Sequence, residues 1–319
     1  MLNFFLRRAA GTITTLFVTT VVAFLIFQLL PGDVAAVIAG QGATKAQILH
    51  IRESLGLSGS FIGQYAHWLS EALFHGSLGV SALTGEPVTQ LLGERLPPTL
   101  QLIAASTIVA LGTSIPLSVG ALRPGSVLDK VGDVWAIIML SIPVFWLGEL
   151  LVLAFSLKLS IFPPSGYVDF FSDPLGSLRF FALPAISFGL YLSSFLIQFL
   201  KPAIRDVLDE DYIRMARAKG LSERRILLRH ILPAALIPFI TQLGILLGTS
   251  VGATIVVEAV FQYPGFGSLF VRAVQQKDFY IVLAGIVVIV GAVVVVNLIV
   301  DLFYGLLDPR VRLRKDAGA

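Results

Sequence analysis

The chain has 319 residues, of which 56% are hydrophobic and only 13% are charged, and its net charge is +3. A soluble domain carries about 25% charged residues, so this composition excludes an ordinary soluble protein and indicates a chain dissolved in a bilayer. The absence of cysteine excludes disulfides, thiolate metal sites and cysteine nucleophiles.

Six stretches of the sequence are apolar enough to cross a membrane, because about 30 Å of hydrocarbon takes roughly 20 mostly apolar helical residues. The predicted spans are 10–30, 99–122, 133–157, 181–200, 234–260 and 280–306. The first span follows Arg7 and Arg8, as the apolar core of a signal peptide would. It ends at Pro31-Gly32-Asp33 without a small-residue cleavage pattern, so we expect it to be retained.

Lysine and arginine are unevenly divided between the segments that connect these spans. With the N-terminus inside the cell, 16 of the 23 basic residues fall in cytoplasmic segments and 7 in outer ones. This bias matches the positive-inside rule with both termini in the cytoplasm, and an odd number of spans would destroy it. We therefore expect an all-α integral membrane protein with six transmembrane helices, forming a single transmembrane domain over residues 1–319.

The connection over residues 31–98 is too long for a simple loop and is predicted to be a periplasmic or extracellular insertion with structure of its own. Thr44 and Gln47 have the spacing of a capping box, and Gly56 lies where that helix would stop. A second short helix is predicted from Gln64 to Phe74.

The cytoplasmic segment 201–233 carries eight basic and five acidic residues. Its spacing predicts a helix over Asp211–Lys219 that its first residue caps and that stops at Gly220. Ser222 is predicted to cap a second helix that ends before Pro233. A solvated basic loop that only sets topology would explain the charges, but it would need neither the paired caps nor this spacing.

Several short motifs together carry a resemblance to a known family. Residues 212–221 read YIRMARAKGL, and Gly220 is followed thirteen residues later by Pro233, with Leu232 before it. Further pieces are LPGD at 30–33, HGSLG at 75–79, RLPPTL at 95–100, SIPVFW at 141–146, VVEAVFQYPGFG at 256–267 and LLDPR at 306–310. Together they resemble the permeases of binding-protein-dependent ABC importers, in the branch for dipeptides, oligopeptides and nickel.

The sequence departs from the general pattern of this family in two places. Where the family's loop has Glu-Ala-Ala before the glycine, this chain has Arg214, Met215 and Ala216. His230 stands where an isoleucine is usual. These departures weaken the general match and leave the branch-specific match intact.

The resemblance implies the fold of the methionine-importer permease, with segment 201–233 as a coupling loop that docks on an ATPase subunit. The resemblance implies three kinds of protein partner: a second homologous permease chain, two ATPase subunits and an extracytoplasmic substrate-binding protein. It also implies that the chain lies in the lipid bilayer of the bacterial inner membrane and binds no nucleic acid. ATP and Mg would bind the ATPase, since this chain lacks a phosphate-binding G-x-x-x-x-G-K-[ST] loop, so we expect no cofactor and no catalytic residue here. Di- or oligopeptides are the expected substrates, with nickel or glutathione as alternatives.

The residues expected to couple this chain to the ATPase form one run in segment 201–233. They are Asp211, Tyr212, Arg214, Ala216, Arg217, Ala218, Lys219, Gly220 and Leu221. Ala216 and Gly220 lie four residues apart and share a helix face. Their small size predicts that a large partner packs closely against that face.

Five further residues are candidates for helix packing or for the pore. Gly244, Gly248 and Gly252 repeat every four residues on one face of the fifth span, where a helix of this chain or a partner permease could approach closely. Glu149 and Glu258 are acids at or within spans, and such residues often face a water-filled cavity. For Glu258, an interfacial or capping role is the alternative.

Two other classes of function stay open from the sequence. Residues Gly248–Gly252 match the G-x-S-x-G pattern of serine hydrolases, but no histidine lies within a span to activate Ser250, and a strand-to-helix elbow is lacking. An ion-coupled secondary transporter often buries ionisable residues at the membrane midplane, and Glu149 is the one feature in its favour. The four histidines show no metal-binding spacing.

Overall fold

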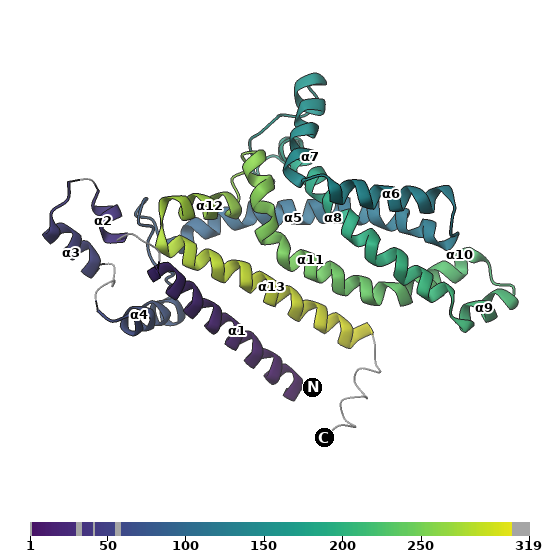
Figure 1. The fold of residues 1–319 in the computed structure, drawn as a ribbon, viewed down its shortest axis with the longest axis horizontal. Helices are drawn as coiled ribbons and strands as arrows, with labels where there is room; N and C mark the ends of the chain where they lie inside the picture. Colours follow the sequence, from purple (N-terminus) through teal and green to yellow (C-terminus); the bar gives the residue numbers. More distant parts are fainter. Residues whose placement is uncertain (1, 30–33, 41, 55–58, 308–319) are drawn as a thin grey trace. The chain divides into compact units, whose positions relative to one another are not determined.

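The computed structural model describes residues 2–29, 34–40, 42–54 and 59–307, drawn as a ribbon in Figure 1. Their regular structure is helical, apart from an isolated antiparallel bridge between Val80 and Pro87. The all-α class predicted from the sequence is therefore confirmed for the described chain.

Three sequence predictions fall outside the described residues. They concern the LPGD motif at 30–33, the helix stop at Gly56 and the last three residues of the LLDPR motif at 306–310.

The described residues form thirteen α-helices, two π-helical segments and one 3-10 turn. The α-helices are α1 (Leu2–Leu29), α2 (Val34–Ala39), α3 (Lys45–Ser54), α4 (Phe61–Phe74), α5 (Val88–Val119), α6 (Val127–Ser141), α7 (Val144–Leu151), α8 (Pro174–Leu208), α9 (Asp211–Ala218), α10 (Glu223–Ile226), α11 (Leu232–Val260), α12 (Phe266–Gln276) and α13 (Phe279–Leu307). The 3-10 turn covers Gly120–Leu122, and the π-helical segments cover Val152–Lys158 and Leu227–Ile231.

Four helical stretches of the described chain are long and apolar enough to cross a membrane. They are Val88–Leu122, Pro174–Leu208, Pro238–Val260 and Phe279–Val300. They coincide with four of the predicted spans, and the pair α6 and α7 makes a fifth if it is one bent span. The apolar stretch of α1, Ala10–Leu25, is shorter. The count of six spans and the cytoplasmic placement of the termini stay predictions.

The predicted span 133–157 is not one straight helix, because the chain bends by 100° between α6 and α7. Pro143 lies at the break. Proline has no backbone N–H and pushes the residue before it out of the helical region. Ile142 accordingly has an extended backbone, with φ −90° and ψ 120°. The segment is a broken span or a re-entrant turn.

The described chain divides into two compact units, and unit 1 comprises residues 1–99 and 264–294. The Phe266 N–H donates to Thr99 Oγ1 over 2.8 Å, which ties α12 to α5. Gly79 has a φ of +100°, and a Cβ there would lie 2.5 Å from the ring of Tyr280. Both the backbone angle and the ring of α13 therefore require glycine at this position.

Two predictions made for the insertion 31–98 are confirmed. The Thr44 N–H donates to Gln47 Oε1 (2.8 Å) and the Gln47 N–H donates to Thr44 Oγ1 (3.4 Å), which are the reciprocal bonds of a capping box at the start of α3. The predicted helix Gln64–Phe74 is α4, which begins three residues earlier, at Phe61.

Unit 2 comprises the described residues within 100–263 and 295–319 and is built around α8. This helix packs against α6, α7 and α11. A Cβ at Gly189 would lie 2.6 Å from the Ser106 carbonyl oxygen, so glycine lets α5 approach α8 closely. The helix continues to Leu208, eight residues beyond the predicted end of its span. Its buried residues near this end belong to the same core cluster as buried residues of α9.

Candidate functional site

Helix α9 occupies the middle of the predicted coupling segment, and two residues separate its start from the end of α8. Glu210 is its N-cap residue, with an extended backbone (φ −69°, ψ 139°) and no side-chain cap bond. Asp211 is therefore the first residue of the helix and not its cap, contrary to the prediction. Its negative charge still suits the partial positive charge of a helix N-terminus.

The end of α9 confirms Gly220 as its stop. Gly220 has a φ of +76°, in the left-handed region that favours glycine. Its N–H donates to the Arg217 carbonyl (2.9 Å), and the Leu221 N–H donates to the Ala216 carbonyl (3.3 Å). These two bonds make a Schellman motif, which closes the helix at Ala218, one residue before the predicted end.

One face of α9 points into the core of unit 2. Ile213 and Ala216 are buried and belong to the same core cluster as Ile204 and Ile226. The sequence predicted that Ala216 and Gly220 share a face open to a large partner, and for Ala216 this is wrong. Its small side chain lets α9 pack closely against helices of its own chain.

The opposite face of α9 is exposed and mixes apolar and charged side chains. Met215 is 59% exposed, with Tyr212 and Arg214 also exposed beside it. Arg214 Nη1 lies 3.5 Å from Asp211 Oδ1. Partial burial and the carboxylate of Glu210 raise the pKa of Tyr212. An exposed methionine and tyrosine within a rim of charges are typical of a protein-binding surface.

An ion pair joins α9 to α10. Arg217 Nε lies 2.9 Å from Glu223 Oε1, and Nη2 lies 3.4 Å from Oε2. The guanidinium therefore donates two hydrogen bonds to the carboxylate, as a bidentate pair. Ala218 and Lys219 are exposed at the end of α9, while Leu221 is half-buried against the core. The predicted coupling run is thus divided between an anchored face and an exposed one.

The second helix of the segment does not end before Pro233, contrary to the prediction. Ser222 stands at the N-cap position of α10, but its side chain makes no cap bond. From α10 the chain passes through the π-helical segment Leu227–Ile231 directly into α11. The Leu232 N–H donates to a carbonyl five residues back, so the bonding pattern shifts just before the proline. Pro233 then fits in the first turn of α11.

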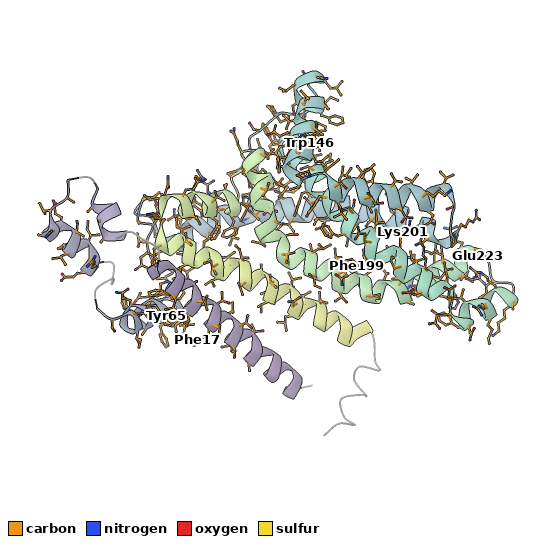
Figure 2. The ribbon with its side chains drawn as sticks, viewed as in Figure 1. Phe17, Tyr65, Trp146, Phe199, Lys201 and Glu223 are labelled. Atoms are coloured by element: carbon orange, nitrogen blue, oxygen red, sulfur yellow. The ribbon has the colours of Figure 1, made fainter. Side chains whose placement is uncertain are left out.

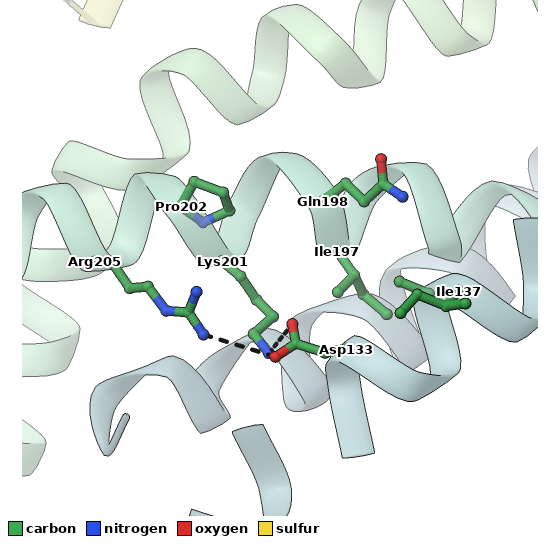
Figure 3. A pocket seen from close by; sticks show the side chains of 8 residues that line it. Asp133, Ile137, Ile197, Gln198, Lys201, Pro202 and Arg205 are labelled. Carbon is green, nitrogen blue, oxygen red and sulfur yellow. Dashed lines mark hydrogen bonds and ion pairs between the residues drawn. The ribbon is translucent and has the colours of Figure 1, made fainter. Parts of the chain in front are cut away.

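A buried ion-pair network that was not predicted from the sequence joins α8 to α6 shortly before α9. Figure 3 shows the part of it in which Lys201 and Arg205 pair with Asp133. Lys201 is 2% exposed. Its Nζ lies 2.8 Å from Asp129 Oδ1 and 2.5 Å from Asp133 Oδ1, both on α6. Arg205 Nη2 lies 2.9 Å from Asp129 Oδ1. The network fastens α8 to α6, and it satisfies a lysine whose charge would be costly to bury alone.

The sequence does contain a signal for this network. Lys201 and Arg205 are four residues apart, and so are Asp129 and Asp133. Each pair therefore lies on one face of a helix, and the two faces have opposite charge. The positive-inside rule uses only the basic pair, so it does not reveal the complementary acidic pair on α6.

A pocket of about 290 Å³ opens beside the network. It is lined by Asp133, Ala136, Ile137, Ile197, Gln198, Lys201, Pro202 and Arg205, seen from close by in Figure 3. Its two cations, Lys201 and Arg205, pair with Asp133 in the lining and with Asp129 behind it, so the four charges balance and leave no free charge for an ionic ligand.

The predicted glycine face of α11 is occupied in part by this chain. A Cβ at Gly244 would overlap the side chain of Val300 on α13. Gly248 is buried and Gly252 is half-buried. Gly244 therefore serves packing within the chain, and contact of Gly248 or Gly252 with a partner permease stays a prediction.

The two acidic candidates lie in opposite environments. Glu149 is on the exposed face of α7, where Phe145 and Trp146 are also exposed. A carboxylate among apolar side chains is costly against lipid, so Glu149 requires water or another chain beside it. Glu258 is fully buried in the last turn of α11, and its carbonyl accepts the Tyr263 N–H over 2.8 Å.

The structure does not support a serine hydrolase. Ser250 lies within α11, and its Oγ donates to the Leu246 carbonyl over 2.6 Å. The Gly248–Gly252 motif is therefore continuous helix and not a nucleophile elbow. Within the described ranges, no group of three His, Asp or Glu side chains is placed to hold a metal ion.

Two family models match almost the whole chain. Residues 112–313 match the family described as binding-protein-dependent transport system inner membrane component. Residues 1–103 match the N-terminal region of binding-protein-dependent transport system membrane components.

Two relatives are similar over nearly their full length. A putative peptide transport system permease protein of Brucella abortus is 37% identical over 315 residues, which cover 96% of this chain and 98% of that protein. A glutathione transport system permease protein of Pectobacterium atrosepticum is 36% identical over 316 residues, which cover 98% of this chain and 100% of that protein.

A solved structure has the same fold. The MetNI methionine ABC transporter, crystallised in inward facing conformations, contains a chain that matches with a TM-score of 0.56 at 18% identity. The match covers 69% of this chain and 97% of that chain. It confirms the importer-permease fold expected from the sequence motifs.

Proposed function

The chain belongs to the family of binding-protein-dependent transport system inner membrane components, and we propose that it forms half of the translocation pore of an ATP-driven importer. The observation that carries the proposal is the two-sided construction of α9. One face is fixed to the core of unit 2, and the other face, around Met215, is exposed as a contact for a second protein.

The packing of α9 supports a role in transmitting motion. Ile213 and Ala216 lie in one cluster with Leu200 and Ile204 of α8 and with Ala235 of α11. Packed interiors deform little, so a push on the exposed face would move α8 and α11 together rather than α9 alone. In the proposed cycle, an ATPase supplies this push and the pore opens alternately to the two sides of the membrane.

The proposed partners and substrates follow from the family and the relatives. We place this chain with a second homologous permease, two ATPase subunits that bind ATP and Mg, and an extracytoplasmic binding protein. The relatives named above are described as peptide and glutathione permeases. Di- or oligopeptides are therefore the proposed substrates, with glutathione next, and nickel rests on the sequence motifs alone. An ion-coupled secondary transporter does not fit this family.

A charge placed on the exposed face of α9 tests the contact with the ATPase. Met215→Glu leaves every core contact in place and should abolish copurification of the ATPase subunits, together with ATP hydrolysis stimulated by the loaded binding protein. The matched control is Leu83→Glu, which places the same charge at another exposed apolar residue, in the insertion 31–98. Full ATPase association in Met215→Glu would refute the proposed contact.

Ala216→Glu distinguishes the two faces of the helix. A carboxylate at this buried position would disturb the core of unit 2, so we expect lower thermal stability as well as weaker ATPase association. Met215→Glu should lower association alone. Equal stability of Ala216→Glu and wild type would contradict the anchored face.

A further inference from the structure

Helix α4 has three faces of different chemistry. With about 3.6 residues per turn, Tyr65 and Trp68 share one face, and both are buried. A second face is exposed and apolar, and its members form the outward stripe Ile62, Ala66 and Leu73. The third face is polar, and its members form the polar edge Gln64, His67 and Glu71.

The outward stripe is unusually exposed for such large side chains. Ile62 is 75% exposed and Leu73 is 69% exposed, and Phe74, the last residue of the helix, is 80% exposed outside the stripe. Three large apolar side chains on one short helix are unfavourable in water, because burying each of them is favourable. The stripe contains no charged group, so it lacks the charged rim that surrounds Met215 on α9.

The buried face fixes the orientation of α4 against α1. Tyr65 OH lies 2.8 Å from Thr20 Oγ1, and the ring of Tyr65 meets the rings of Phe17 and Phe24 edge-on, with centroids 6.1 and 5.5 Å apart. Figure 2 shows Phe17 and Tyr65 close to one another. The Trp68 Nε1–H donates to the Leu78 carbonyl over 3.4 Å. The helix therefore cannot turn its outward stripe inward without breaking these contacts.

The same aromatic cluster places α4 at the end of an apolar span. The ring of Phe24 also meets the ring of Phe279, with centroids 5.1 Å apart. Phe279 is the first residue of the membrane-spanning stretch Phe279–Val300. Helix α4 thus packs at the level where this span begins, which is the boundary between hydrocarbon and water. Phe17 of α1, which touches α4, is itself half exposed.

From the outward stripe, the polar edge and the level of the helix, we propose that α4 lies on the membrane surface as an interfacial helix. The outward stripe contacts lipid acyl chains, and the polar edge faces water. An amphipathic helix at the bilayer boundary is stable in this position, because its apolar side leaves water and its polar side stays hydrated. The insertion 31–98 is then attached to the lipid surface as well as to α1.

The native chain lacks cysteine, so single cysteines can report the surroundings of each face. The test uses Ile62→Cys and Leu73→Cys on the outward stripe, with His67→Cys and Glu71→Cys on the polar edge as matched controls. Each is labelled with the fluorophore NBD in the complete transporter, reconstituted into phosphatidylcholine vesicles. Quenching is measured with brominated lipid, which acts from the acyl chains, and with iodide, which acts from water.

We expect the ratio of bromolipid to iodide quenching to be at least about twofold higher at positions 62 and 73 than at positions 67 and 71. Equal ratios at all four positions would overturn the proposal. So would labels at 62 and 73 that neither quencher reaches, because the stripe would then be covered by protein. If only addition of the binding protein shields these labels from iodide, the stripe is a protein-docking surface and not a lipid contact.

Discussion

Helices α4 and α9 are both short amphipathic helices with one face anchored, and they differ in what the other face presents. The outward stripe of α4 is apolar, while the exposed face of α9 carries Met215 and Tyr212 among charged neighbours. Lipid favours a continuous apolar surface, whereas a protein partner favours apolar anchors with a polar rim. The exposed face of each helix therefore indicates what it meets outside the chain.

The anchors of the two helices differ as well. Helix α4 is held by aromatic rings and by hydrogen bonds that include those of Tyr65 to Thr20 and of Trp68 to Leu78. Helix α9 is held by aliphatic side chains, and a buried ion-pair network around Lys201 fastens α8 behind it. An ion pair inside the core has a larger effect when one partner is lost, so the anchor of α9 is the more vulnerable to a single substitution.

The largest expected effect in this comparison comes from Lys201→Met. Removing the lysine leaves the buried Asp129 with Arg205 as its remaining cation, and breaking a buried pair costs about 3–5 kcal/mol. Thermal unfolding of the purified chain in detergent measures the loss. Arg205→Met is the control, because Arg205 is partly exposed and should cost less than about 1 kcal/mol. An equal loss of stability in the two variants would contradict the larger effect expected from burial of Lys201.

Truncating the aliphatic anchor of α9 comes next. Ile213 is fully buried, and replacing a buried isoleucine by alanine costs about 2–5 kcal/mol. Ile213→Ala should therefore loosen α9 and expose the segment to proteases. Met215→Ala, on the exposed face, should change stability by less than about 0.5 kcal/mol. Similar protease sensitivity in the two variants would contradict the assignment of the two faces.

The features of α9 that the sequence predicts are those set by neighbouring residues. Gly220 stops the helix because its backbone must be left-handed, and this requirement is local. The direction of Ala216 depends on which face the core of unit 2 covers, so it does not follow from helix spacing alone. The spacing of Ile213 and Ala216 indicates one shared face, but helix spacing does not tell whether this chain or a partner covers that face.

The path of the chain at its prolines was harder to predict. The sequence predicts one span through Pro143, yet the chain bends by 100° there. The sequence predicts that a helix ends before Pro233, yet the helix continues through this proline after the π-helical segment Leu227–Ile231. Proline removes one N–H in both places, and the surrounding packing decides whether the chain bends or shifts its hydrogen bonds.

A smaller effect is expected at the anchor of α4. Tyr65→Phe keeps the ring contacts and removes only the hydrogen bond to Thr20, which costs about 0.5–1.5 kcal/mol. The Thr20 hydroxyl still donates to the Phe17 carbonyl, so no buried group loses its last partner. Thermal unfolding of Tyr65→Phe and of Tyr65→Phe/Thr20→Val measures the loss. If the double variant loses much more than the single one, the hydroxyl of Thr20 has a further role.

The smallest effect on stability is expected from Arg217→Gln. Arg217 and Glu223 are both largely exposed, so their ion pair contributes less than about 1 kcal/mol and should weaken further in high salt. A double-mutant cycle with Glu223→Gln isolates the pair, because each single variant removes the same contact.

ATPase association, measured on the same four proteins, separates two roles for the arginine. If Arg217 only holds α10 against α9, both single variants weaken association equally. If Arg217 also meets the ATPase, Arg217→Gln weakens association more than Glu223→Gln does, while their stabilities stay alike. The second result would extend the partner surface from Met215 to the charged rim, and the first would confine it to the apolar centre.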